Sequence, residues 1–235
     1  MPGLSAGGTR HTERGGGIIE VYFEQIVPLM LKGIPMTLQL LLYGTLLAAV
    51  MSFVFGLARL SRFAAVRGTA SVLVELIRGT SLIVQLFWIY YALPHLGIEL
   101  PKLPAAVIAI GINYGAYGSE IVRSAITAVP QGQREAAIAL NFSAFQRMRH
   151  IIVPQALLRM LPPFGNLQVE LLKGTSLAYF IGLGEVFYRT MTQLNYYLYL
   201  LVPIFAGLLV IYFTLSQLVL LLYRWAERRL AAGRV

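Results

Sequence analysis

Long apolar stretches without a charged residue dominate the pattern of hydrophobic and polar positions along the chain. The stretch 37–58 has no charged residue, and neither has the stretch 190–223. Because about 20 apolar residues of helix cross a bilayer core, each stretch is long enough to span a membrane. We expect five spans, at about Met36–Leu57, Ser71–Leu93, Leu103–Ser124, Pro163–Leu183 and Tyr197–Tyr223. The pattern therefore predicts an all-α membrane protein built on a five-helix transmembrane bundle.

The composition agrees with this fold class. Hydrophobic residues make up 57% of the chain and charged residues only 12%, whereas soluble domains carry about 25% charged residues. There is no cysteine, which excludes disulfides, thiolate metal sites and cysteine catalysis. The three histidines, His11, His95 and His150, lie far apart and lack the spacing of metal ligands.

The distribution of basic residues predicts the orientation of the bundle. The formal net charge is +9, and arginines are concentrated after the first span, in the long connection 123–159 and after the fifth span. Short cytoplasmic loops are rich in Lys and Arg, so we expect an extracytoplasmic N-terminus and a cytoplasmic C-terminus. Termini on opposite sides of the membrane require an odd number of spans, which agrees with five. The alternative explanation of the charge, binding to nucleic acid, is disfavoured.

The chain divides into three predicted parts. Residues 1–33 are glycine-rich and then mildly amphipathic, and we expect a partly disordered tail. One interpretation of Ile18–Leu31 is a helix that lies on the membrane surface. We expect no signal peptide, because no apolar core precedes a small-residue cleavage site. The transmembrane domain is expected at 34–228 and a short cytoplasmic tail at 229–235.

A segment of the second predicted span recurs in the fourth. Glu-Leu-Ile-Arg-Gly-Thr-Ser-Leu at 75–82 matches Glu-Leu-Leu-Lys-Gly-Thr-Ser-Leu at 170–177. Internal repeats are common in transporters, where the pathway lies between them, and both copies here would run outward from the cytoplasm. Ionisable residues inside a span are costly and usually face a cavity or a partner. The acids and bases of the repeat either line or gate a polar pathway or act as structural clamps near the inner interface.

The third predicted span is polar along one face, where Asn113, Tyr117 and Glu120 recur at helical spacing. These side chains are either a cavity lining or polar contacts between helices. The candidate substrate pathway therefore comprises Glu75, Arg78, Asn113, Tyr117, Glu120, Glu170 and Lys173.

The long third connection predicts two short helices joined by a bend. An alanine-rich run favours a first helix up to Leu140. Asn141 tolerates a left-handed conformation, and Ser143 can cap a second helix at Ala144–Ile152. Pro154 is expected to end that helix. The pair either fills a groove on a partner or forms an amphipathic loop at the membrane interface.

These residues resemble a known family. Glu135-Ala-Ala, a turn residue at Asn141 and Ile-Ile-Val-Pro154 after a basic helix resemble the EAA loop of importer permeases in ATP-binding-cassette systems. The two Gly-Thr-Ser-Leu copies resemble its polar amino-acid branch. The resemblance covers about residues 33–228. Two departures are Asn141, where the family typically has Gly, and Ser81, where Pro is usual.

The resemblance implies the type I permease fold of ATP-binding-cassette importers, with an EAA loop at about 127–157. It implies a coupling role for Glu135, Ala136, Ala137, Asn141, Phe145, Arg147, Ile151 and Pro154. The implied partners are ATP-binding-cassette ATPase subunits, a second permease subunit (identical or homologous), an extracytoplasmic solute-binding protein and membrane lipid. The implied substrate is an amino acid or a related zwitterion, and the implied location is the bacterial plasma membrane, spanned several times.

No Gly-x-x-x-x-Gly-Lys-Ser/Thr phosphate loop occurs in the chain. We therefore expect a non-catalytic subunit without a cofactor of its own, whose partner ATPase binds ATP and Mg. The alternative function is an ATP-independent secondary transporter or channel.

Overall fold

The computed structural model describes residues 20–232. The disorder predicted for most of the N-terminal tail lies outside the described residues. All regular structure in the described residues is helical. In chain order, with η marking 3₁₀- and π-helical segments, the helices are η1 (Val21–Ile26), α2 (Val27–Leu31), α3 (Ile34–Ala58), α4 (Ala64–Gly79), α5 (Leu82–Phe87), η2 (Trp88–Ala92), η3 (Leu93–Leu96), α6 (Lys102–Thr127), α7 (Gln131–Ala139), α8 (Ala144–Arg147), η4 (Met148–Ile152), α9 (Val153–Gly174), η5 (Thr175–Ile181), α10 (Val186–Leu194), η6 (Leu198–Leu200) and α11 (Leu201–Ala232).

Helices occupy all five positions at which the sequence predicts a span. By length and composition, three segments within 20–232 could cross a membrane alone: Val21–Ala58, Lys102–Thr127 and Leu198–Arg229. A fourth is the pair Ala64–Gly79 and Leu82–Leu96, if the bent pair counts as one span. The remaining position, that of the fourth predicted span at Pro163–Leu183, is occupied by α9 and η5, where charged residues interrupt the apolar sequence.

The prediction of one continuous second span at Ser71–Leu93 is wrong. The chain bends by 99° between α4 and α5, because Thr80 and Ser81 are extended, with ψ of 152° and 137°. Polar side chains bond the carbonyls that the break exposes. The Thr80 hydroxyl donates to Leu76 O, and Gln85 Nε2 donates to Ile77 O over 2.7 Å. Side-chain hydrogen bonds therefore stabilise the break between α4 and α5.

The α3–α6 pair lies at the centre of the bundle. Small residues recur every four positions along the buried face of α3, at Gly44, Ala48, Ser52 and Gly56. A Cβ added at Gly115 of α6 would lie 2.4 Å from the Cβ of Met51. Because lipid gives no hydrophobic drive for helix association, such close backbone approach supplies the packing energy.

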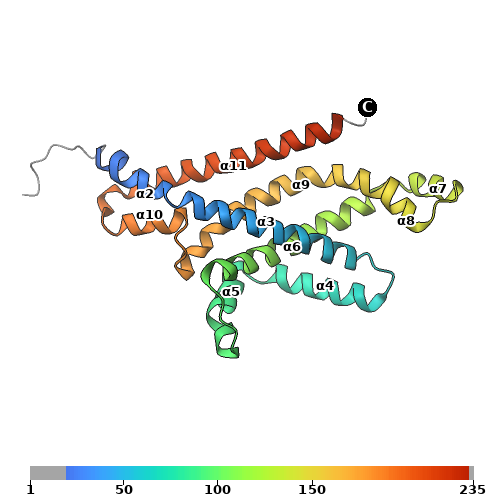
Figure 1. Ribbon diagram of the computed structural model, residues 1–235, viewed down its shortest axis with the longest axis horizontal. Coiled ribbons are helices and arrows are strands. Elements are labelled where there is room, and N and C mark those ends of the chain that lie inside the picture. The colour runs from blue at the N-terminus through green and yellow to red at the C-terminus, as the bar shows by residue number, and fades with distance from the viewer. Residues whose placement is uncertain (1–19, 233–235) are drawn as a thin grey trace, which may run out of the picture.

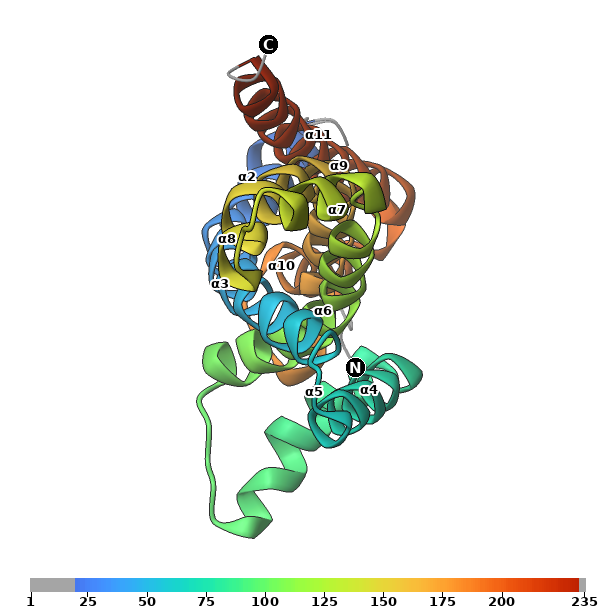
Figure 2. The ribbon, with the colours of Figure 1, turned by 90° about the vertical axis from the view of Figure 1, so that its right-hand side faces the viewer.

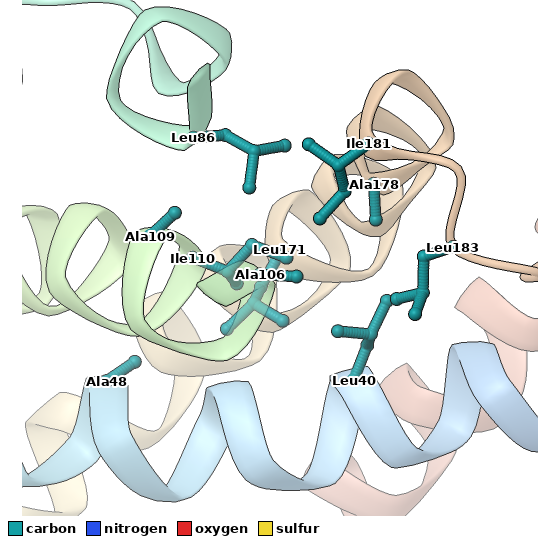
Figure 3. Close-up of a cluster of buried hydrophobic side chains, with 10 residues drawn as sticks. All are labelled: Leu40, Ala48, Leu86, Ala106, Ala109, Ile110, Leu171, Ala178, Ile181 and Leu183. Carbon is teal, nitrogen blue, oxygen red and sulfur yellow. The ribbon is translucent and has the colours of Figure 1, made fainter. Parts of the chain in front are cut away.

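A hydrophobic cluster packs the α3–α6 pair against α5 and η5. Figure 3 shows Leu86 of α5 beside Ile181 of η5, above Ile110 of α6. All three side chains are at most 2% exposed. The cluster comprises Leu40, Ala48, Leu86, Ala106, Ala109, Ile110, Leu171, Ala178, Ile181 and Leu183. It therefore packs α5 and η5, which each begin within a repeat copy and continue past its end, against the α3–α6 pair.

The described part of the N-terminal tail is helical and packs on the bundle. Ile26 and Met30 are fully buried against Val186, Leu200 and Ile204 of the α10–α11 region. The placement of this segment on the membrane surface stays a prediction.

The ends of the molecule differ in composition. The α3–α4 connection, α7 and α8, and the C-terminal end of α11 lie at one end, whereas α2 and α10 lie at the other (Figure 1). Figure 2 views the α7–α8 end and shows α4 and α5 to one side of the bundle. The three arginine-rich segments therefore share one end.

Candidate functional site

The bend after α7 has the geometry of a Schellman motif. Asn141 has a φ of 57° and is the one described residue other than glycine with a positive φ. Its N–H donates to Ile138 O over 2.9 Å, and the N–H of Phe142 donates to Ala137 O over 3.0 Å. The predicted left-handed conformation of Asn141 is confirmed.

The second loop helix begins as predicted but does not end as predicted. Ser143 and Gln146 form a capping box, which confirms the predicted cap at Ser143. The helix then passes through the π-helical segment η4 into α9 without a break, so the prediction that Pro154 ends it is wrong. Pro154 lies in the first turn of α9, where the preceding π-turn accommodates a residue without an N–H. One continuous helix therefore joins Ala144 to Gly174.

The predicted coupling residues differ in exposure. Ala137 is 1% exposed, whereas Glu135 and Ala136 face outward and Phe145 is 69% exposed. Arg147, Ile151 and Pro154 are half-buried. A cavity of about 530 Å³ lies beneath α7, lined by Thr127, Val129, Gln131, Arg134, Glu135 and Ile138. The exposed face of α7 therefore includes the short side chain of Ala136, and the cavity beside this helix is lined by both polar and apolar residues.

One face of α6 contacts both copies of the repeat. The hydroxyl of Tyr117 donates to Arg78 O over 3.4 Å, and the Arg78 guanidinium carbon lies 5.0 Å from the centroid of the Tyr117 ring. One turn earlier, the hydroxyl of Tyr114 donates to Glu170 O over 2.8 Å. The α6 helix therefore connects the two copies through main-chain carbonyls.

The predicted pathway residue Asn113 contacts the bend between α4 and α5. Its Nδ2 donates to Gln85 Oε1 over 3.1 Å, and Gln85 in turn donates to the Thr80 hydroxyl over 2.7 Å. Asn113 is 4% exposed. In the described chain it is therefore a polar contact between helices, one of the two interpretations that the sequence left open.

Glu120 lies between two arginines. Its Oε2 is 2.8 Å from Arg59 Nη1 at the end of α3, and its Oε1 pairs with Arg123 Nη2. The carboxylate is thus neutralised within the chain and connects α3 to α6.

The remaining pathway candidates, Glu75, Glu170 and Lys173, are exposed. Lys173 borders a cavity of about 570 Å³ between α9, α10 and α11, which is lined by Val169, Lys173, Ser176, Phe187, Leu208, Leu209, Tyr212, Phe213, Ser216, Gln217 and Leu220. Of the seven pathway candidates, Arg78 and Tyr117 are in contact and Asn113 bonds to the bend that follows Arg78. Glu120 pairs with arginines, and Lys173 borders the cavity beside α11. Within residues 20–232 no group of His, Asp and Glu side chains could hold a metal ion.

Sequence reasoning missed Glu185, which caps α10 from a fully buried position. Its carboxylate accepts from the N–H groups of Phe187 and Tyr188, both over 2.7 Å, and from the hydroxyl of Tyr212 over 3.0 Å. Burial raises the pKa of Glu185 to about 7, against the lowering effect of these hydrogen bonds. An acid directly before an apolar helical run was the available signal.

The chain matches a known family of membrane proteins. Residues 44–232 match the model of the family described as binding-protein-dependent transport system inner membrane component. The chain is 44% identical over 172 residues to the probable amino-acid ABC transporter permease protein y4tF of Sinorhizobium fredii (strain NBRC 101917 / NGR234), covering 71% of this chain and 72% of that protein. It is 36% identical over 203 residues to the L-cystine transport system permease protein TcyB of Bacillus subtilis (strain 168), covering 86% and 87%.

A solved structure gives the same assignment. The crystal structure of an amino acid ABC transporter with histidines superposes with a TM-score of 0.81 at 32% identity, covering 89% of this chain and 97% of that chain. The fold is that of a type I importer permease. In such systems ATP hydrolysis lies in a partner subunit, so this chain is non-catalytic. The chain belongs to the family of binding-protein-dependent transport system inner membrane components and is the permease subunit of an ATP-driven importer.

Proposed function

We propose that this chain forms one half of the translocation pathway of an importer for amino acids or related zwitterions, and that a separate ATPase drives it through α7. The other half is a second permease subunit, and an extracytoplasmic solute-binding protein delivers the substrate. The relatives named for amino-acid and L-cystine transport support this substrate class. The N-terminus lies outside the plasma membrane and the C-terminus in the cytoplasm.

The observation that carries the coupling role is the shape of α7. Ala136 presents a surface without a long side chain, next to the exposed carboxylate of Glu135. Small residues permit close approach of a partner helix or groove, and a carboxylate can accept a hydrogen bond from a basic partner residue. Gln131 Nε2 donates to the Glu135 carboxylate over 2.8 Å, which orients it on the α7 surface.

The proposed orientation is supported by the common end of the three arginine-rich segments (Figure 1). Several arginine-rich segments at one end of a bundle are expected where that end faces the cytoplasm. The α7–α8 segment, which lies at that end, is then accessible to a cytoplasmic ATPase.

The proposed mechanism is a change between two states of the spans. ATP binding closes the ATPase dimer and displaces α7 and α8, which biases the spans from inward-open to outward-open. The continuous helix from Ala144 carries this displacement toward the second repeat copy at Glu170–Gly174. The contacts of Tyr114 and Tyr117 of α6 relate that copy to the first one. Both repeat copies then move together when the spans change state.

The test is a double substitution on the exposed face of α7, Glu135→Lys with Ala136→Asp. Buried Ala137 is left unchanged, because a charge there would disrupt folding. We expect loss of ATPase co-purification and of uptake of radiolabelled amino acids by proteoliposomes, with an unchanged size-exclusion profile of the permease. The matched control is Gln133→Lys, an exposed position of the same helix. Unchanged assembly and transport in the double variant would refute the docking role, and uptake without any ATPase would favour the secondary-transporter alternative.

A further inference from the structure

The C-terminal end of α6 is bonded by arginines from both sides of the coupling loop. Arg134 of α7 donates through Nη2 to Ile126 O over 2.6 Å. Arg159 of α9 donates through Nη1 to Ala128 O. We propose that Arg134 and Arg159 are positioning residues that fasten α7 and α9 to the end of α6, so that displacement of the loop moves the third and fourth spans together. The inference rests on the proposed function, because it assumes that α7 receives the ATPase.

The chemistry of a helix end explains why arginine suits this position. The last carbonyls of a helix lack partners within it and carry the negative end of the helix dipole. A guanidinium satisfies the carbonyl and the dipole with one charge-assisted bond. Arg134 is half-buried, and its Nε is buried without a hydrogen-bond partner among the described residues. Its Nη2 bond to Ile126 O joins α7 to the end of α6.

An apolar cluster packs the end of α6 against η4 and the first turns of α9. It comprises Val122, Ala125, Ile126, Val129, Ile152, Ala156 and Met160. Apolar contact is non-directional, so this packing alone would let α9 slide or rotate against α6. Hydrogen bonds with defined donors and acceptors fix the register of the surfaces. The apolar cluster stabilises the contact between the helices, and the arginine bonds fix their relative position.

The loop has its own internal stabilisation, which separates positioning from folding. The turn at Asn141 and the capping box at Ser143 use bonds within the loop alone. The exposed surface of Glu135 and Ala136 does not include either arginine contact. Removal of the arginines should therefore leave α7 able to fold and to bind the ATPase, while its displacement no longer reaches α6.

The functional test uses the whole transporter, with its ATPase subunits and solute-binding protein, in proteoliposomes. The variant is Arg134→Ala with Arg159→Ala, and the readouts are ATP hydrolysis and uptake of a mixture of radiolabelled L-amino acids. We expect co-purification to persist and ATP hydrolysis to stay within about twofold, while uptake per ATP falls about tenfold, as the loss of charge-assisted bonds predicts. Lysine at both positions should restore part of the coupling, because its ammonium can donate one of these bonds. The matched control is Arg149→Ala, an exposed arginine of η4.

A second measurement needs no partner protein. The chain has no cysteine, so cysteines introduced at exposed Ser124 of α6 and Gln133 of α7 can carry a pair of spin labels. We expect a narrow distance distribution in the parent chain and a broadened one in the double arginine variant. An unchanged distribution with unchanged coupling would overturn the proposal, and so would loss of ATPase binding in the double variant. If the parent permease failed to couple to any ATPase, the proposed function would fail, while the spin-label result would still report on the arginine contacts.

Discussion

The buried carboxyl of Glu185 makes the stability of the permease depend on pH, and Glu185→Gln should remove that dependence. Glu185 lies outside the predicted spans, between the fourth and the fifth, and is fully buried. It accepts three hydrogen bonds, two of them from the first N–H groups of α10. The N–H of Val186 also donates to the hydroxyl of Thr37 over 3.3 Å, so this helix end connects α3, α10 and α11.

The direction of the effect follows from the raised pKa. Burial raises the pKa of Glu185 from 4.5 to about 7, so the folded chain holds its proton more tightly than the unfolded chain does. The contribution to the free energy of unfolding is fully present below pH 4.5 and is lost as the pH rises through about 7. At about 1.4 kcal/mol for each pKa unit, the loss amounts to about 3 kcal/mol at high pH.

Glutamine in place of Glu185 does not ionise, but its amide nitrogen cannot accept one of the two N–H bonds. We therefore expect Glu185→Gln to be less stable than the parent at pH 5 by about 1 kcal/mol, from one unpaired buried donor. At pH 8 the difference should shrink or reverse. Glu185→Ala should be destabilised at pH 5 by about 2 kcal/mol or more, because both N–H groups lose their acceptor. Alanine does not ionise either, so its difference from the parent should also shrink as the pH rises to 8.

The assay is thermal unfolding of the purified permease in detergent at pH 5, 6, 7 and 8. The control is Glu99→Gln, an exposed acid between α5 and α6, whose curve should parallel that of the parent. Parallel curves for the parent and Glu185→Gln would refute the reasoning, because they would mean that Glu185 does not change protonation on folding.

Three further predictions concern packing, the loop and the ion pairs. Gly115→Val should abolish a monodisperse size-exclusion peak, because a Cβ there would lie 2.4 Å from the Cβ of Met51, whereas Gly68→Ala, with open space, should have no effect. Asn141→Gly should keep ATPase co-purification, whereas Asn141→Val should weaken it, since the left-handed conformation is accessible to Gly and Asn but costs valine about 1–2 kcal/mol. Glu120→Gln should lower the thermal unfolding temperature at low salt, because both arginine partners lose their counter-charge.

Local sequence rules predicted the long apolar spans and the loop turn. The first, third and fifth spans are visible because their helices are apolar over a bilayer thickness. The conformations of Asn141 and Ser143 depend on neighbours within a few residues, so residue type alone indicated them. The family and the importer function were identified from the loop and repeat motifs, and the comparisons confirm both.

Features that depend on distant contacts could not be predicted. At the 99° bend at Thr80–Ser81, the side chain of Gln85 bonds Ile77 O and the Thr80 hydroxyl. A single glutamine in an apolar segment does not indicate such bonds from sequence alone. The helix continues past Pro154 because a π-turn precedes it, and no local signal marks such a turn. The burial of Glu185 could not be predicted, since only the fold brings Tyr212 to it.

The helix that begins at Ala144 and ends at Gly174 has a geometric consequence for the transport stroke. Arg159 lies midway along it, and at about 1.5 Å for each residue each half is about 22 Å long. Because Arg159 bonds the midpoint of this helix to the end of α6, a displacement of the near half moves that half together with α6. Pro162 and Pro163 follow the holding point and weaken the main-chain ladder there. In the proposed mechanism these prolines would let the far half bend relative to the near half, and would so limit how much of the displacement of α7 and α8 reaches the second copy at Gly174.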